Sequence, residues 1–268
     1  MTKGKLLIIG GKEEKYHGVI LKQFIELANE QTGKIGILTT ATNYPVEVGK
    51  EYQKVFAKLG RSDSLTIDVD TKEKAEDNAI LKLVENLSAL FITGGDQSRL
   101  NKIITGTKLH KMFFEKWEKG MVLSGTSAGA SIMGKHMIVA AMTKDEDEIL
   151  KVEMDGGFGF LETLLIDQHF SQRARFDRLL GAIAEHPELI GIGIDENTAI
   201  LVDGDEFSVI GEHQVLIIDG KECKFSSVSK SEAGGEELAV SDFKLHTLTA
   251  GYKFNLSTRK PIGKEVAK

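Results

Sequence analysis

The stretch Met121-Val122-Leu123-Ser124-Gly125-Thr126-Ser127-Ala128-Gly129-Ala130 decides the fold. It opens with an apolar run typical of a buried strand, and small residues compatible with a helix follow the serine. Its centre matches G-x-S-x-G, the pattern of a sharp strand-to-helix turn that exposes a nucleophilic serine. The alternative is a tight turn whose serine only caps the helix. The order of strand, turn and helix favours Ser127 as a nucleophile.

Short apolar runs alternate with helical patterns on the amino-terminal side of this turn. Glycines bound several of these runs, as expected for buried parallel strands. The expected strands are 6–9, 35–38, 65–69, 90–92 and 121–123, and the expected helices lie near 20–28, 46–59, 80–87 and 109–117. This alternation predicts an α/β fold, with a doubly wound, mostly parallel sheet and helices on both faces.

The carboxyl-terminal half is less regular. Its expected elements are strands at 164–166, 190–194 and 199–202, a helix at 173–185, a hairpin made of 207–210 and 215–218, and a mobile loop at 226–237. Neither a repeat nor a linker divides the chain. We therefore predict a single domain over residues 1–268, with a core at about 5–219 and a β-rich edge and tail at about 220–268.

Composition excludes several classes of function. The net charge is -6 and no Lys/Arg-rich run occurs, so nucleic acid is not an expected partner. No apolar stretch approaches the roughly 20 residues that span a bilayer, so we expect no membrane segment. Cys223 is the single cysteine. An intramolecular disulfide is therefore impossible, and a reducing, cytoplasmic location is expected.

No cofactor or metal is expected either. The acidic run at 145–148 lacks the glycine and the alternation of a calcium-binding loop. The sequence Gly10-Gly11-Lys12 lacks the spacing of a phosphate-binding loop.

A serine hydroxyl needs a base to act as a nucleophile near neutral pH. His169 follows the apolar run at 164–166, so it lies at the carboxyl end of an expected strand, where ligands bind in open α/β sheets. The carboxylate that orients the imidazole is either Asp195 or Glu196, because consecutive residues leave a strand on opposite sides. The pattern does not choose between them.

Backbone N–H groups that stabilise a tetrahedral intermediate are expected from Ala128 and from Gly94-Gly95, at the end of the preceding strand. Asp96, Gln97 and Arg99 would line the same rim. Arg173, Arg175 and Arg178 follow His169. Such a cluster favours recognition of a carboxylate, although a solvated helix face is the alternative.

Taken together, these segments resemble the cyanophycinase family of serine peptidases, which also contains aspartyl dipeptidases. The segments that carry the resemblance are 91–97, 125–130, 157–161, 167–170, the three arginines and 193–196. The resemblance implies a fold like that of class I glutamine amidotransferases. It also implies a triad of Ser127, His169 and Glu196. For the reaction of such a triad, we expect Gly95 and Ala128 to be the oxyanion donors.

The resemblance further implies a substrate. Cyanophycin is a poly-aspartate backbone with arginine on each side-chain carboxyl, and family members release β-Asp-Arg dipeptides from its end. The residues expected to shape the pocket are Gln97, Asp167, Gln168, Arg173, Arg175 and Arg178, with the arginines facing substrate carboxylates and Asp167 facing substrate arginine. A homodimer is expected from the same resemblance.

Two alternatives stay open. One is a dipeptidase of the same family that cleaves α-aspartyl bonds. The other is a non-catalytic, amidotransferase-like module, although a glutaminase of that fold would need cysteine where Ser127 stands.

Overall fold

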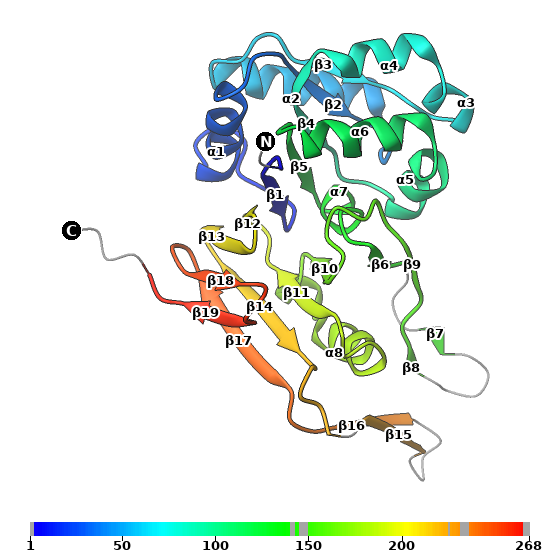
Figure 1. The fold of residues 1–268 in the computed structure, drawn as a ribbon, viewed down its shortest axis with the longest axis vertical. Helices are drawn as coiled ribbons and strands as arrows, with labels where there is room; N and C mark the ends of the chain where they lie inside the picture. The colour runs from blue at the N-terminus through cyan, green and yellow to red at the C-terminus, as the bar shows by residue number, and fades with distance from the viewer. Residues whose placement is uncertain (1–2, 140–142, 145–149, 225, 231–235, 265–268) are drawn as a thin grey trace.

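The computed structural model describes residues 3–139, 143–144, 150–224, 226–230 and 236–264. Two sheets organise the chain. Figure 1 shows most of the helices gathered around β1 to β5, with the second sheet and α8 at the other end of the molecule. The acidic run at 145–148 lies outside the described residues.

The larger sheet has nine strands in the order β19-β18-β13-β12-β1-β5-β4-β2-β3. Its parallel strands are β1 (Leu6–Ile9), β2 (Lys34–Leu38), β3 (Leu65–Ile67), β4 (Leu87–Ile92) and β5 (Val122–Thr126). Antiparallel strands extend it on the other side of β1, namely β12 (Thr198–Asp203), β13 (Glu206–Gly211), β18 (Lys253–Asn255) and β19 (Lys260–Ile262).

Helices cover both faces of the parallel strands, as the alternation predicted. Alternate residues of a strand face opposite sides. Leu7 and Ile9 pack with α1 and α2, whereas Leu6 and Ile8 belong to the core cluster that contains α3 to α7. The helices are α1 (Val19–Asn29), α2 (Pro45–Lys58), α3 (Lys72–Ala75), α4 (Asn78–Glu85), α5 (Gln97–Ile104), α6 (Lys108–Glu118) and α7 (Ala128–Ser131). The doubly wound α/β fold is confirmed.

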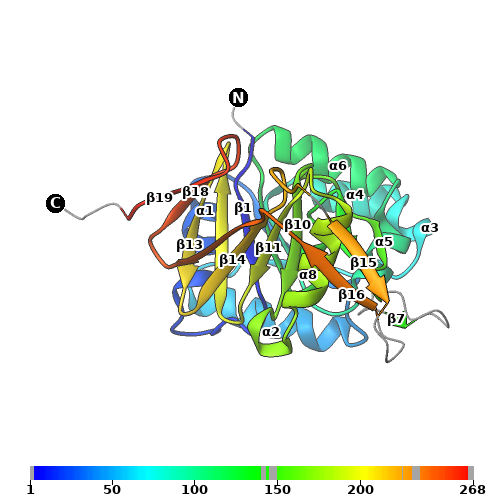
Figure 2. The same ribbon diagram turned by 90° about the horizontal axis from the view of Figure 1, so that it is seen from below.

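The second sheet has four strands in the order β10-β11-β14-β17. They are β10 (Leu164–Gln168), β11 (Ile190–Ile194), β14 (Gln214–Asp219) and β17 (Lys244–Thr249), of which β10 and β11 are parallel. Helix α8 (Phe176–Glu185) packs on one face through Leu179 and Ile183. The other face joins the main core, and Figure 2 shows β14 and β11 lying in front of β1 when the molecule is seen from below.

Three details of the second half differ from the expectations. The hairpin of 207–210 with 215–218 is wrong, because β13 and β14 belong to different sheets. The two linking residues bond to the start of β12 instead. Glu212 N–H donates to Asn197 O at 3.0 Å, and His213 N–H donates to Thr198 Oγ1 at 3.0 Å. The chain therefore crosses between the sheets at this point.

The expected helix at 173–185 is divided. A 3-10 turn, η1 (Ser171–Arg173), comes first, and Ala174 with φ 49° separates it from α8. The expected loop at 226–237 contains two paired strands, β15 (Ser226–Lys230) and β16 (Glu236–Val240), and residues 231–235 lie outside the described residues.

Short two-stranded ladders complete the description. They are β6 (His136–Ile138) with β9 (Met154–Gly156), and β7 (Thr143–Lys144) with β8 (Leu150–Lys151). No helix in the described part of the chain is both long and apolar enough to cross a membrane.

Candidate active site

Ser127 occupies the sharp turn between β5 and α7, with φ 54° and ψ -112°. This conformation is costly for a residue with a side chain, and such strain persists only where the surroundings enforce it. The glycines two residues before and after Ser127 show how closely the surroundings enclose this turn. A Cβ on Gly125 would lie 2.1 Å from Gly129 O, and a Cβ on Gly129 would lie 2.3 Å from Ile92 O. Only glycine fits at both positions of the motif.

A chain of hydrogen bonds links an alcohol, an imidazole and a carboxylate. Ser127 Oγ lies 3.0 Å from His169 Nε2, and His169 Nδ1 lies 2.7 Å from Glu196 Oε1. The carboxylate accepts a hydrogen bond from Nδ1–H, which leaves Nε2 free to accept the serine proton. This is the arrangement of a nucleophile, a general base and an orienting acid.

The structure resolves the choice between the two carboxylates. Asp195 is buried, and its Oδ1 accepts a hydrogen bond from Ser171 N–H at 2.9 Å. Glu196 points to the opposite side and meets the imidazole. The alternation of strand residues accounts for the difference.

Electrostatics keep the base neutral and the acid charged. Burial lowers the pKa of His169 and outweighs the hydrogen bond to Glu196, and the positive charges of Arg173 and Arg175 lower it further. Burial alone would raise the pKa of Glu196, but hydrogen bonds from Lys12 and His169 reverse the direction, so the net pKa is lowered. Lys12 Nζ lies 3.0 Å from Glu196 Oε1.

The two sheets meet at the end of β1. His169 N–H donates to Gly10 O at 2.8 Å, and Asn197 N–H donates to Gly11 O at 2.9 Å. Gly11 has φ +100°, and a Cβ there would lie 2.3 Å from His169 Cε1. The residues of this turn therefore support the imidazole directly. Sequence reasoning tested this turn only as a phosphate-binding loop, although its double glycine after a strand was the available signal.

The expected oxyanion donors lie beside the serine. The N–H of Ala128 is the first of α7 and has no acceptor inside that helix. A Cβ on Gly94 would lie 3.3 Å from Ser127 Cβ, so this turn runs directly past the nucleophile. Gly95 has φ +144°, and a Cβ there would lie 2.1 Å from Ala41 O, which requires glycine. Their role as oxyanion donors stays a prediction.

The residues expected to bind substrate divide into two groups. Gln168 is buried, and its Oε1 accepts from Ser127 Oγ at 3.3 Å. Gln97 begins α5 and donates to Ile138 O at 3.0 Å. Arg173 is exposed, and no carboxylate among the described residues pairs with it. It is thus available to a ligand near the imidazole.

Asp167, Arg175 and Arg178 bind one another instead. Asp167 Oδ1 accepts from Arg175 Nη1 at 3.0 Å, and its Oδ2 accepts from Arg178 Nε at 2.6 Å. Its side chain is 1% exposed, whereas both arginine side chains are 12% exposed. Two cations of the chain itself therefore already pair with this carboxylate, and its expected contact with a substrate arginine stays a prediction.

A small pocket opens beside the nucleophile. It has a volume of about 230 Å³. Its lining residues are Lys12, Glu13, Lys15, Val48, Glu51, Tyr52, Gly94, Thr126 and Ser127. Sequence reasoning missed Glu13 and Tyr52, because nothing in their sequence context marks them.

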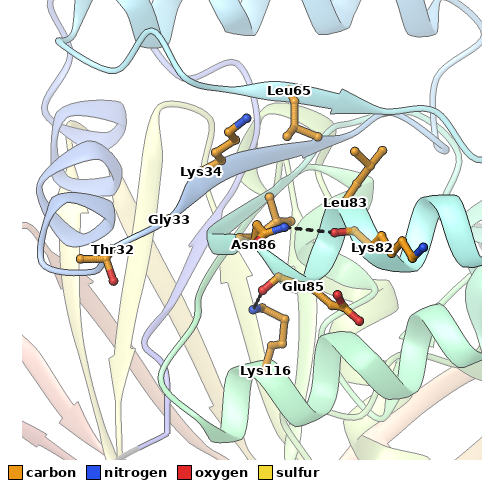
Figure 3. Close-up of a pocket in the computed structure, with 10 residues that line it drawn as sticks. Thr32, Gly33, Lys34, Leu65, Lys82, Leu83, Glu85, Asn86 and Lys116 are labelled. Atoms are coloured by element: carbon orange, nitrogen blue, oxygen red, sulfur yellow. Dashed lines mark hydrogen bonds between the residues drawn. The ribbon is translucent and has the colours of Figure 1, made fainter.

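A larger pocket of about 590 Å³ lies elsewhere (Figure 3). It is lined by Gly33, Lys34 and Leu87, which mark the amino ends of β2 and β4. Ligands of open α/β sheets bind at the opposite, carboxyl ends. Size alone is therefore a poor guide here, and the chemistry lies at the small pocket.

Comparisons with known proteins identify the family of this chain. The sequence model of peptidase family S51 matches residues 6–210. The cyanophycinase of Geminocystis herdmanii is 36% identical over 263 residues, which make up 97% of this chain and 96% of that protein. The cyanophycinase of Trichormus variabilis is 34% identical over 262 residues, or 96% of this chain and 87% of that protein. A crystal structure of a peptidase from an acI-B1 Actinobacterium has the same fold, with a TM-score of 0.74, 23% identity, and coverage of 95% of this chain and 97% of that one.

Proposed function

Since the chain belongs to peptidase family S51, we propose that it is a serine exopeptidase that hydrolyses cyanophycin to β-Asp-Arg dipeptides. The observation that carries the substrate is the match to cyanophycinases over nearly the whole length of both chains. The hydrogen-bonded series Ser127, His169 and Glu196 supports the reaction type.

The proposed reaction breaks a backbone amide of the polymer. His169 Nε2 removes the proton of Ser127 Oγ, which attacks the carbonyl carbon and forms a tetrahedral oxyanion. The N–H groups of Gly95 and Ala128 bind that oxyanion. The imidazolium then gives its proton to the leaving amine, and an acyl-enzyme remains. Water, deprotonated by the same imidazole, releases the acyl group and restores the serine.

A backbone cleavage follows from the product. The β-Asp-Arg dipeptide keeps the bond between the aspartate side chain and arginine, so the bond that breaks must join one aspartate to the next. Each unit also carries a free carboxylate on its arginine. Arg173 is the proposed partner for a substrate carboxylate, because it is exposed beside His169 and no carboxylate among the described residues pairs with it.

The other expected binding residues act less directly in this proposal. Gln168 touches the nucleophile, and Gln97 lies at the start of α5. Asp167 holds Arg175 and Arg178 in place, so that these two arginines present their remaining N–H groups with a fixed orientation.

Mass spectrometry of the products tests the proposal. Incubation of purified cyanophycin with the wild-type chain should release β-Asp-Arg, and Ser127→Ala should release none above background. Ser124→Ala is the matched control, because Ser124 is a buried serine on β5, the strand that leads to Ser127, and its hydroxyl bonds to Leu7 O. Release of free arginine, or equal product from Ser127→Ala, would refute the assignment.

Two alternatives are separated by related assays. An α-aspartyl dipeptide is the diagnostic substrate for the dipeptidase activity, and faster cleavage of this dipeptide than of the polymer would favour it. A fluorophosphonate should label Ser127 in any active serine peptidase but not in a non-catalytic module.

The homodimer and the cytoplasmic location stay predictions. Light scattering coupled to size-exclusion chromatography tests the first, and fractionation of the host cell tests the second.

A further inference from the structure

The small pocket beside Ser127 contains an acidic group that the proposed reaction does not use. Its volume of about 230 Å³ lies below the roughly 300–1,000 Å³ of pockets that enclose drug-sized ligands. A single side chain is the kind of group that fits. The pocket opens next to the nucleophile, so any side chain in it belongs to a residue close to the bond that breaks.

Glu13 is the buried acid of this pocket. The residue is 5% exposed. Its Oε1 accepts from Tyr52 Oη at 2.5 Å, and its Oε2 accepts from Thr126 Oγ1 at 2.6 Å. Both donors are hydroxyls, and no cation among the described residues lies within ion-pair distance of it. Buried carboxylates are normally paired with a cation, so this one lacks its usual partner.

The other charges of the pocket are already paired. Lys12 binds Glu196, and Lys15 Nζ lies 2.6 Å from Glu51 Oε1. Both pairs are more exposed than Glu13. A ligand that enters the pocket therefore meets one carboxylate that has no ion-pair partner among the described residues.

The ring of Tyr52 adds a surface that suits a cation. Lys15 Nζ lies 5.1 Å from the centre of this ring, which shows that a positive charge already approaches its face. Burial, followed by the charge of Glu13, raises the pKa of Tyr52, so the phenol keeps its proton and continues to donate to Glu13. The ring and the carboxylate together match the flat, cationic end of an arginine side chain.

We propose that this pocket binds the guanidinium of a substrate arginine, with Glu13 as its ion-pair partner and the Tyr52 ring as its stacking surface. The inference rests on the proposed function and deepens it. It assigns recognition of the substrate arginine to Glu13 and Tyr52 rather than to Asp167, whose carboxylate is held by two arginines of the chain itself.

A pair of synthetic peptides tests the proposal. One is a trimer of β-Asp-Arg units, and the other carries citrulline, a neutral isostere, in place of arginine. The measured quantity is the ratio of kcat/KM for the two peptides. The wild type should favour arginine by roughly tenfold to a hundredfold, as expected for one charge-assisted hydrogen-bonded pair. In Glu13→Gln the ratio should fall to about threefold or less. A general loss of structure lowers both rates and leaves the ratio unchanged, so the ratio separates recognition from damage.

Two further variants are compared with Glu13→Gln, one expected to leave the ratio of kcat/KM values unchanged and one expected to raise it. Glu47→Gln is the matched control, because it removes the same charge from an exposed position on α2, outside the pocket, and the ratio should stay at the wild-type value. Lys15→Gln should raise the ratio, because Glu51 loses its cation and adds a second free carboxylate to the pocket. An unchanged ratio in Glu13→Gln would overturn the inference while leaving the proposed function intact. Absence of cleavage of cyanophycin by the wild type would refute the function and the inference with it.

Discussion

The substitution Gly11→Ala should disable the base without replacing any residue of the triad. A Cβ at this position would lie 2.3 Å from His169 Cε1 and 2.6 Å from Nε2. Ordinary contact begins at 3.4 Å, so the imidazole must retreat by about 1 Å. Hydrogen bonds to Glu196 and to Gly10 O hold His169 elsewhere. The motion therefore lengthens the 3.0 Å bond to Ser127.

The expected loss of activity is large. A misplacement of about 1 Å costs on the order of 100-fold in rate, and removal of a general base costs on the order of 100- to 10,000-fold. We expect kcat/KM to fall within that range. The assay is steady-state hydrolysis of the β-Asp-Arg trimer, together with the rate of fluorophosphonate labelling of Ser127, which should fall in parallel.

Gly60→Ala is the control that isolates backbone strain. Gly60 has φ +98°, nearly the same as the +100° of Gly11, but nothing lies within 4 Å of a Cβ there. Both variants should lose about 1–2 kcal/mol of stability from the left-handed conformation. Only Gly11→Ala should lose activity. Equal kcat/KM values in the two variants, with His169 in contact with Ser127, would refute the reasoning.

Three further predictions concern the same site. The pKa of His169 is lowered and the base acts in its neutral form, so kcat/KM should fall only as the pH drops below the ordinary histidine value of 6.5. Arg173→Gln should move this fall in kcat/KM to higher pH, because the variant removes a positive charge that lowers the pKa of His169. Glu196→Gln should reduce kcat roughly 100- to 10,000-fold with little change in the melting temperature, since it loses the carboxylate that orients the imidazole; an unchanged kcat would contradict that role. Asp167→Asn should destabilise the fold by about 3–5 kcal/mol in urea unfolding, because two half-buried arginines lose their shared carboxylate, and a change below 1 kcal/mol would contradict the structural role.

The sequence predicted the parallel half of the fold because each signal there is local. Apolar runs bounded by glycines identify the strands, and helical spacing identifies the helices between them. The position of His169 after an apolar run was also enough to select it among the histidines. Because ligands of open α/β sheets bind at the carboxyl ends of the strands, the same position predicted that His169 lies near Ser127.

The second half was harder because its pairing is not local. β13 and β14 are separated by two residues and read as a hairpin, yet each finds its partners in a different sheet. Alternation of apolar residues predicts that a strand has a buried face, but it does not predict which strand lies beside it. Tertiary packing decides which sheet each strand joins. Val209 of β13 and Val215 of β14 lie in one hydrophobic core although their strands belong to different sheets.

The roles of the expected binding residues stay predictions for a related reason. A sequence shows that Asp167, Arg175 and Arg178 are close, but it does not show whether their charges face a ligand or each other. The structure pairs them internally. Conversely, Glu13 is one charge in the polar run that follows β1, and its proposed binding role rests on its burial against Tyr52 and Thr126, which the sequence does not show.

The candidate site draws on both sheets, and this has a physical consequence. Ser127 follows β5 of the nine-stranded sheet, whereas His169 and Glu196 follow β10 and β11 of the four-stranded sheet. Their alignment to within a hydrogen-bond length therefore depends on how the two sheets are joined. Backbone bonds at Gly10 and Gly11 make that connection. Because interfaces between packed elements resist small displacements, we expect the contact between the sheets, made at this turn, to fix the distance between nucleophile and base.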